Sequence, residues 1–103
     1  MITTSDVIIV EQASIEQYDG PTLVCYPKYF PDSEVVQMEM GVQDGTGVTA
    51  VNLKYVTYTF TKAEIDAQTV SATANVAHWM EAVEEKTKAF LEALNPSATF
   101  TIV

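Results

Sequence analysis

The two most reactive side chains in this sequence each occur once: a histidine, His78, and a cysteine, Cys25. A metal site needs three or four convergent ligands, and a catalytic nucleophile needs a base beside it. His78 lies in a helical pattern where Glu81 or Glu85 offers at most a weak ligand pair. Cys25 lies in the apolar run 22–26, where a thiol usually acts as a small hydrophobic side chain. We therefore expect no catalytic residue, no metal ligand and no cofactor.

The acidic residues are numerous, so a close pair of carboxylates carries little weight by itself. The sequence has 14 acidic residues among 103. A general acid needs a carboxyl group whose pKa is raised by burial. Glu81, Glu85 and Glu92 recur on one side of a predicted helix, but that side is polar. We interpret these three glutamates as a solvated or partner-binding face.

A glycine-containing segment, Gln-Asp-Gly-Thr-Gly at 43–47, is the next candidate for chemistry. A phosphate-binding loop places its backbone amides at the start of a helix and carries a lysine. Segment 43–47 instead joins two stretches that alternate like strands, and glycine supplies the positive φ of tight hairpins. The segment therefore predicts a hairpin turn.

An aromatic segment, Tyr-Pro-Lys-Tyr-Phe-Pro at 26–31, places three aromatic residues and two prolines within six positions. The prolines predict a loop over 27–32. Aromatic side chains in loops commonly anchor protein interfaces, because they bury a large area at low entropic cost. Two interpretations stay open: Tyr26, Tyr29 and Phe30 bind a partner, or Tyr29 and Phe30 fold back over the core.

The composition, with 48% apolar and 18% charged residues, is that of an ordinary globular domain. All five basic residues are lysines, and the net charge is -9. Without the arginine fork, and with a field that repels polyanions, we expect no direct nucleic-acid binding and no membrane binding. Neither a signal peptide nor an apolar run of about 20 residues is present. We expect a cytoplasmic or virion location and no secretion by a signal peptide.

Four stretches predict strands: 7–11, 22–26, 35–42 and 48–60. A helical turn over 14–18 and a turn at 19–21 separate the first two. In the third, Val36, Met38, Met40 and Val42 alternate toward the core.

The fourth strand changes the phase of its alternation midway. Its apolar residues are Val51, Leu53 and Tyr55 on one face and Val56, Tyr58 and Phe60 on the other. A bulge near Tyr55 or Val56 explains the change. Alternatively, both faces of the strand are covered.

The C-terminal half predicts a helix. Residues 61–64, Thr-Lys-Ala-Glu, match a capping box, but 69–73 is poor helix material, and Thr73 is an alternative cap. Continuity from Lys62 to Leu94 therefore stays open, whereas 75–94 is well supported and ends at Asn95-Pro96. Its apolar stripe is Val76, Met80, Val83, Phe90 and Leu94, with Trp79 and Leu91 beside it.

The last residues, 98–103, predict a strand that returns to the sheet. The sequence thus predicts a single α+β domain over 1–103. Its architecture is an antiparallel or mixed sheet of about four to five strands, with one long C-terminal amphipathic helix packed on one face.

These features favour a non-catalytic structural or assembly subunit that acts through protein-protein contacts, for example a capsid, neck or tail accessory protein of a phage virion. Self-association or membership of a larger assembly is expected, through Tyr26, Tyr29 and Phe30 or through strand edges. The alternative is a small acidic inhibitor in which Glu81, Glu85 and Glu92 imitate nucleic-acid phosphates on a basic protein surface. An enzyme site assembled from distant residues is the third hypothesis.

Overall fold

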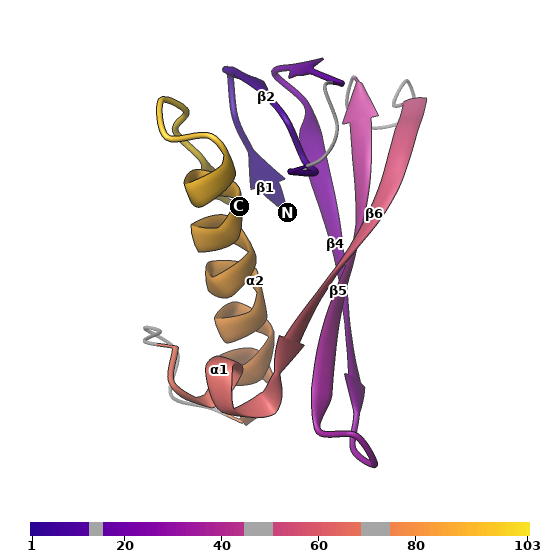
Figure 1. The fold of residues 1–103 in the computed structure, drawn as a ribbon, viewed down its shortest axis with the longest axis vertical. Coiled ribbons are helices and arrows are strands. Elements are labelled where there is room, and N and C mark those ends of the chain that lie inside the picture. The colour runs from indigo at the N-terminus through magenta and orange to yellow at the C-terminus, as the bar shows by residue number, and fades with distance from the viewer. Residues whose placement is uncertain (13–15, 45–50, 69–74) are drawn as a thin grey trace.

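The fold is a twisted antiparallel sheet with one long helix packed against one of its faces (Figure 1). The computed structural model describes residues 1–12, 16–44, 51–68 and 75–103, with 75–78 described only as helix backbone. The five strands of the main sheet lie in the order β6-β5-β4-β1-β7, and every neighbouring pair is antiparallel. This arrangement confirms the predicted α+β class.

Three long consecutive strands make up most of the sheet: β4 (Thr22–Phe30), β5 (Val35–Asp44) and β6 (Val51–Thr61). Two short strands, β1 (Ile2–Thr3) and β7 (Thr101–Ile102), extend it beside β4. A separate two-stranded sheet pairs β2 (Val7–Ile8) with β3 (Tyr18–Asp19). The helices are α1 (Lys62–Asp66) and α2 (Asn75–Leu94).

The core lies between α2 and the inner face of the sheet. The predicted alternation of β5 is confirmed, because Val36, Met38, Met40 and Val42 are completely buried. The pairing of β5 with β6 also confirms the hairpin. Gln43 and Asp44 belong to β5 itself, and the remainder of the expected turn lies outside the described residues.

The predicted loop over 27–32 is wrong for 27–30, because β4 continues through Pro27 to Phe30, whereas 31–32 do lie in the turn before β5. Proline lacks an N–H group, so it is tolerated mainly where a strand has no neighbour on one side. Strand β1 pairs with β4 only at Thr22 and Leu23. Beyond Leu23, β4 is therefore an edge on that side, within the described residues, and Pro27 is compatible with the strand.

The irregularity in β6 lies earlier than predicted. The register with β5 shifts between Val42 and Gln43, which pair with Lys54 and Asn52 and leave Leu53 as the extra residue. From Tyr55 onward the alternation is regular, with Tyr55 exposed and Val56 buried. The apolar residues change face because β6 carries apolar side chains on both faces, not because of a bulge at that step.

The N-terminal region forms shorter strands than predicted. Strand β2 covers only two of the residues in 7–11, and neither β1 nor β3 was expected. Of the predicted helical turn over 14–18, Tyr18 belongs to β3, while Ser14 lies outside the described residues. Two-residue strands are set by distant partners, here β4 and β7 for β1, which local sequence does not reveal.

The capping box is confirmed, and the helical region is not continuous. The Thr61 hydroxyl accepts a hydrogen bond from the Glu64 N–H at 3.1 Å, and Glu64 accepts one from the Thr61 N–H at 3.0 Å. Helix α1 nevertheless ends at Asp66, capped by Ala67, and α2 begins at Asn75. Thr73, the alternative cap, lies outside the described residues.

The buried side of α2 is displaced from the predicted stripe. Among the described side chains of α2, Ala82, Val83, Thr87 and Leu91 are buried, whereas Met80 and Phe90 are partly exposed. Of the predicted stripe, Val83 is thus confirmed as buried, and the side chain of Val76 lies outside the described residues. Thr87 is compatible with the core because its hydroxyl donates a 2.8 Å hydrogen bond to the Val83 carbonyl.

Asn95, which ends α2, fastens the helix to the N-terminal region. Its side-chain Oδ1 accepts from the Ile9 N–H at 2.8 Å. Its Nδ2 donates to the carbonyls of Ile9 and Leu91, each at 2.9 Å. The side-chain amide thus pairs with both the N–H and the carbonyl of Ile9, as a neighbouring strand would. An apolar side chain at position 95 could not form these hydrogen bonds.

Asn95→Ala should therefore lower the free energy of unfolding by about 2 kcal/mol, because it leaves partly buried backbone groups of Ile9 without partners. Urea denaturation followed by circular dichroism measures the change. The matched control is Asn52→Ala, which removes a single exposed hydrogen bond from Gln43. It should change stability by less than about 0.5 kcal/mol. Equal effects of the two substitutions would contradict the role assigned to Asn95.

Candidate interaction surface

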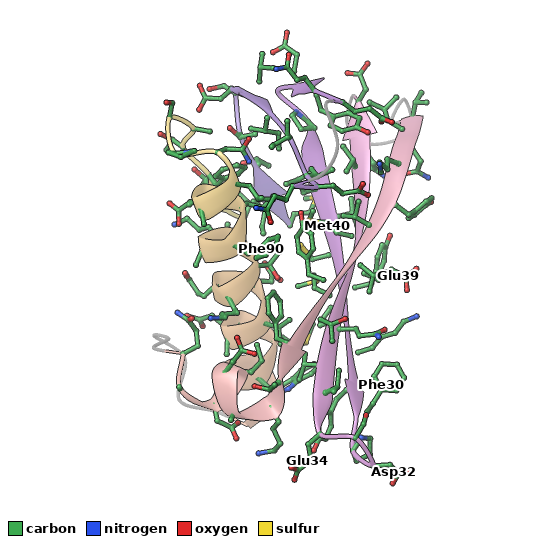
Figure 2. All side chains as sticks on the ribbon, in the orientation of Figure 1. Phe30, Asp32, Glu34, Glu39, Met40 and Phe90 are labelled. Carbon is green, nitrogen blue, oxygen red and sulfur yellow. The ribbon has the colours of Figure 1, made fainter. Side chains whose placement is uncertain are left out.

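The face of the sheet turned away from α2 is not covered by any described element, and we call it the outer face. Figure 2 shows Met40 directed toward the helix and its neighbour Glu39 directed away from it. The same alternation, carried across the register, places Tyr26, Lys28 and Phe30 of β4 on the outer face. Together with Glu39 of β5 and Tyr55 of β6, these residues define the candidate surface.

Three aromatic rings dominate this surface. Tyr26 is 51% exposed, Phe30 42% and Tyr55 59%. The ring of Tyr55 lies against the backbone of Gly41, its cross-strand partner, where a Cβ would be 3.4 Å from Tyr55 Cε1. A Cβ at this position would make an ordinary van der Waals contact with the ring, which lies over the backbone of Gly41.

A single ion pair lies between these rings. Lys28 Nζ is 2.7 Å from Glu39 Oε2, and both residues line a shallow groove with Tyr26 and Tyr55. The other outward positions near them are uncharged: Gln37, Gln43, Asn52, Thr57 and Thr59. Removing one acid from 14 and one lysine from 5 leaves 13 and 4, so the net charge of -9 lies entirely elsewhere.

The predicted partner-binding residues of the aromatic segment are divided between two faces. Tyr26 and Phe30 lie on the outer face, but Tyr29 pairs with the buried Val36 and lies on the inner side. Its ring centroid is 6.4 Å from that of Trp79 on α2. Alternation along β4 causes this division, since the segment is a strand and not a loop.

Tyr55 was not predicted as a site residue. The sequence places it in a strand, but only the register shows that it lies across Gly41 near Tyr26. Which residue of the neighbouring strand lies beside Tyr55 cannot be read from the sequence alone, because it depends on the strand register.

The predicted acidic residues lie on a different surface. Glu81, Glu85 and Glu92 occupy the side of α2 away from the buried residues Val83 and Thr87. Glu92 is exposed, whereas Glu81 and Glu85 are half-buried. The six predicted partner-binding residues therefore do not form one site.

Cys25 faces inward against the core. Its thiol lies 3.6 Å from the Leu23 carbonyl, to which it donates a hydrogen bond. The pKa of this thiol is raised to about 11, mainly by burial; the N-terminal amine opposes the rise and the nearby Glu84 carboxylate adds to it. The thiol therefore stays protonated near neutral pH. The side chain of His78 lies outside the described residues.

No group of three or more His, Cys, Asp or Glu side chains within 1–12, 16–44, 51–68 and 79–103 is placed to hold a metal ion. In the part of the chain that the structure describes, neither helix combines the length and apolarity needed to cross a bilayer. No family model, curated protein or solved structure matches this chain.

Cys25 should react slowly with a thiol reagent such as iodoacetamide. The thiolate is the reactive form, and a pKa of about 11 instead of 9.0 leaves about 100-fold less thiolate at about pH 8. The rate should keep rising with pH beyond 9, the ordinary value. The urea-unfolded chain serves as the control and should react at the ordinary rate. A native rate that levels off near pH 9 would show that burial does not hold this thiol protonated.

Proposed function

We propose that this protein is a non-catalytic structural subunit that associates with further copies of itself through the outer face. The observation that carries the proposal is an uncovered sheet face with three exposed aromatic rings and no net charge, on a chain whose net charge is -9.

The composition of this face suits protein-protein contact. Aromatic side chains bury a large area and lose few rotamers, which is why they are enriched at interface hot spots. Charged residues are depleted at interface centres. The single pair Lys28–Glu39 is internally compensated, so two outer faces can approach each other without excess charge of one sign.

The setting we propose is a larger assembly, such as a phage capsid, neck or tail. The support is compositional: a short acidic α+β chain with threonine-rich strands and no reactive cluster resembles accessory subunits of such particles. The protonated thiol of Cys25 and the shallow grooves of the described surface agree with a non-catalytic role.

The acidic side of α2 supports a competing proposal, an inhibitor that imitates nucleic-acid phosphates. Glu81, Glu85 and Glu92 share one side of the helix, but Lys88 lies directly beside them, about 20° from Glu81 around the helix axis. A lysine among three glutamates weakens the local negative potential, so we place this proposal second.

Tyr26→Asp should weaken self-association by about 2 kcal/mol, because it introduces a charge at the centre of the outer face. Sedimentation velocity over a wide range of protein concentration measures the change. Val7→Asp is the matched control, since Val7 is exposed to a similar degree on β2, outside the main sheet. It should leave association unchanged.

The same measurement tests whether the acidic side of α2, and not the outer face, is the surface of self-association. If neutralising Glu81, Glu85 and Glu92 to glutamine abolishes association while Tyr26→Asp does not, the acidic side of α2 is the contact surface. The outer-face proposal would then be wrong. Loss of association with both Tyr26→Asp and Val7→Asp would also count against a specific surface.

A further inference from the structure

We infer that β6 pairs edge to edge with β6 of a second copy, antiparallel and about a two-fold axis at Tyr58. This inference rests on the proposed assembly function and adds a second contact surface to it. Together the two main sheets would form one continuous sheet across the dimer.

The first observation is the position of β6. It is the outermost strand in the order β6-β5-β4-β1-β7, and among the described residues it pairs only with β5. Figure 1 shows this strand crossing diagonally from the upper end of the sheet to its lower end beside α1. An edge strand presents a row of unpaired N–H and C=O groups, which another strand can satisfy.

The second observation is that residues 55–61 of β6 lack the features that normally protect an edge strand from pairing. Proteins protect edges by shortness, prolines, lysines or bulges. Strand β7 has only two residues, and the free part of β4 carries Pro27 and Lys28. In β6 the bulge and Lys54 lie near its start, so residues 55–61 form seven regular positions with no charge and no proline.

The third observation is that residues 55–61 are complementary to themselves. An antiparallel pair centred on Tyr58 keeps inner-face residues opposite inner-face residues and outer opposite outer. Cross-strand Thr–Thr pairs and pairs of aromatic with β-branched residues stabilise antiparallel sheets. The facing residues would be Tyr58 and Tyr58, Thr57 and Thr59, Val56 and Phe60, and Tyr55 and Thr61.

The fourth observation is an apolar strip on the flank of α2 next to this edge. Phe90 is 39% exposed, although its ring centroid lies 4.5 Å from that of Tyr58 and 6.4 Å from that of Phe60. Figure 2 shows Phe90 projecting from the helix toward the sheet. Ala89 and Ala93, both exposed, line the same groove between α2 and β6. A second copy would cover this strip with its own.

The charges around the edge favour a second copy over a partner of opposite charge. The residues that bound the seven positions, Lys54 and Lys62, already pair with Glu11 and Asp66 of the same chain. In the groove beside α2, Lys86 Nζ lies 3.7 Å from Glu64 Oε2. The edge therefore offers neutral backbone and apolar surface, which an identical edge matches through an isologous contact.

A charge-swap experiment tests this pairing. One variant carries Thr57→Lys with Thr59→Lys, and a second carries Thr57→Glu with Thr59→Glu. In the inferred register, position 57 faces position 59 of the other copy, so like charges meet in each variant alone. Sedimentation velocity should show a dimer for the unmodified chain, at least tenfold weaker dimerisation for each variant, and a one-to-one dimer when the two variants are mixed.

The control is Val7→Lys, which adds a charge on β2, outside both the outer face and the β6 edge. It should leave the dimer intact. Hydrogen exchange gives a second readout: amide protection within 55–61 should increase with protein concentration in the unmodified chain. An unmodified chain that stays monomeric, or variants that dimerise normally, would overturn the inference, as would a mixture that fails to recover the dimer while each variant remains folded.

The outcome also separates this inference from the proposed function. Association that is abolished by Tyr26→Asp but unaffected by charges at 57 and 59 would remove the β6 contact and leave the outer-face contact. A dimer that depends on positions 57 and 59 but not on Tyr26 would remove the outer-face contact and leave the β6 contact.

Discussion

The structure depends on the burial of one sheet face beneath one helix. Strands β4, β5 and β6 carry the inward residues, and α2 supplies Val83, Thr87 and Leu91 against them. Burial of apolar area at roughly 25 cal/mol per Å² is the main favourable term for such a core. A single helix covers only one face, so every alternate residue of the three strands remains on the other side. The core therefore does not determine which residues lie on that other face of the sheet.

Local patterns predicted the elements whose causes are local. Three such features depend only on residues close together in the sequence. They are the capping box at Thr61, the alternation of β5 and the end of α2 at Asn95. The continuation of β4 through Pro27 could not be predicted, because it depends on how short β1 is. The same holds for β1, which pairs with β4 and with the distant β7, whereas a final strand within 98–103 was predicted and is confirmed as β7.

The candidate surface could be predicted only in part, for a related reason. Aromatic residues in 26–30 were recognisable as interface candidates, but which of them share a face follows from strand alternation. Tyr55 joins them through a register that a shift at Leu53 helps to set. A misplaced bulge of even one residue exchanges the two faces of a strand. The sequence therefore indicated the kind of side chain and not its neighbours.

Most of the positive charge of the chain lies in ion pairs around the sheet. Four lysines form ion pairs within the chain: Lys28, Lys54, Lys62 and Lys86. Exposed pairs of this kind contribute only about 0–1 kcal/mol each. Their larger effect is to place positive charge beside acidic residues around the sheet, while the excess of acidic over basic residues gives the chain its negative field.

The pairing of β1 with β7 bears on the order in which the chain folds. Strands β4, β5 and β6 connect neighbours in sequence, so they form by closing short loops within residues 22–61. Joining Ile2 to Ile102 closes almost the whole chain, and the entropy of that closure grows with its length. We therefore expect the three-stranded meander to form before the terminal strands pair, with α2 docking on its apolar face as the chain condenses.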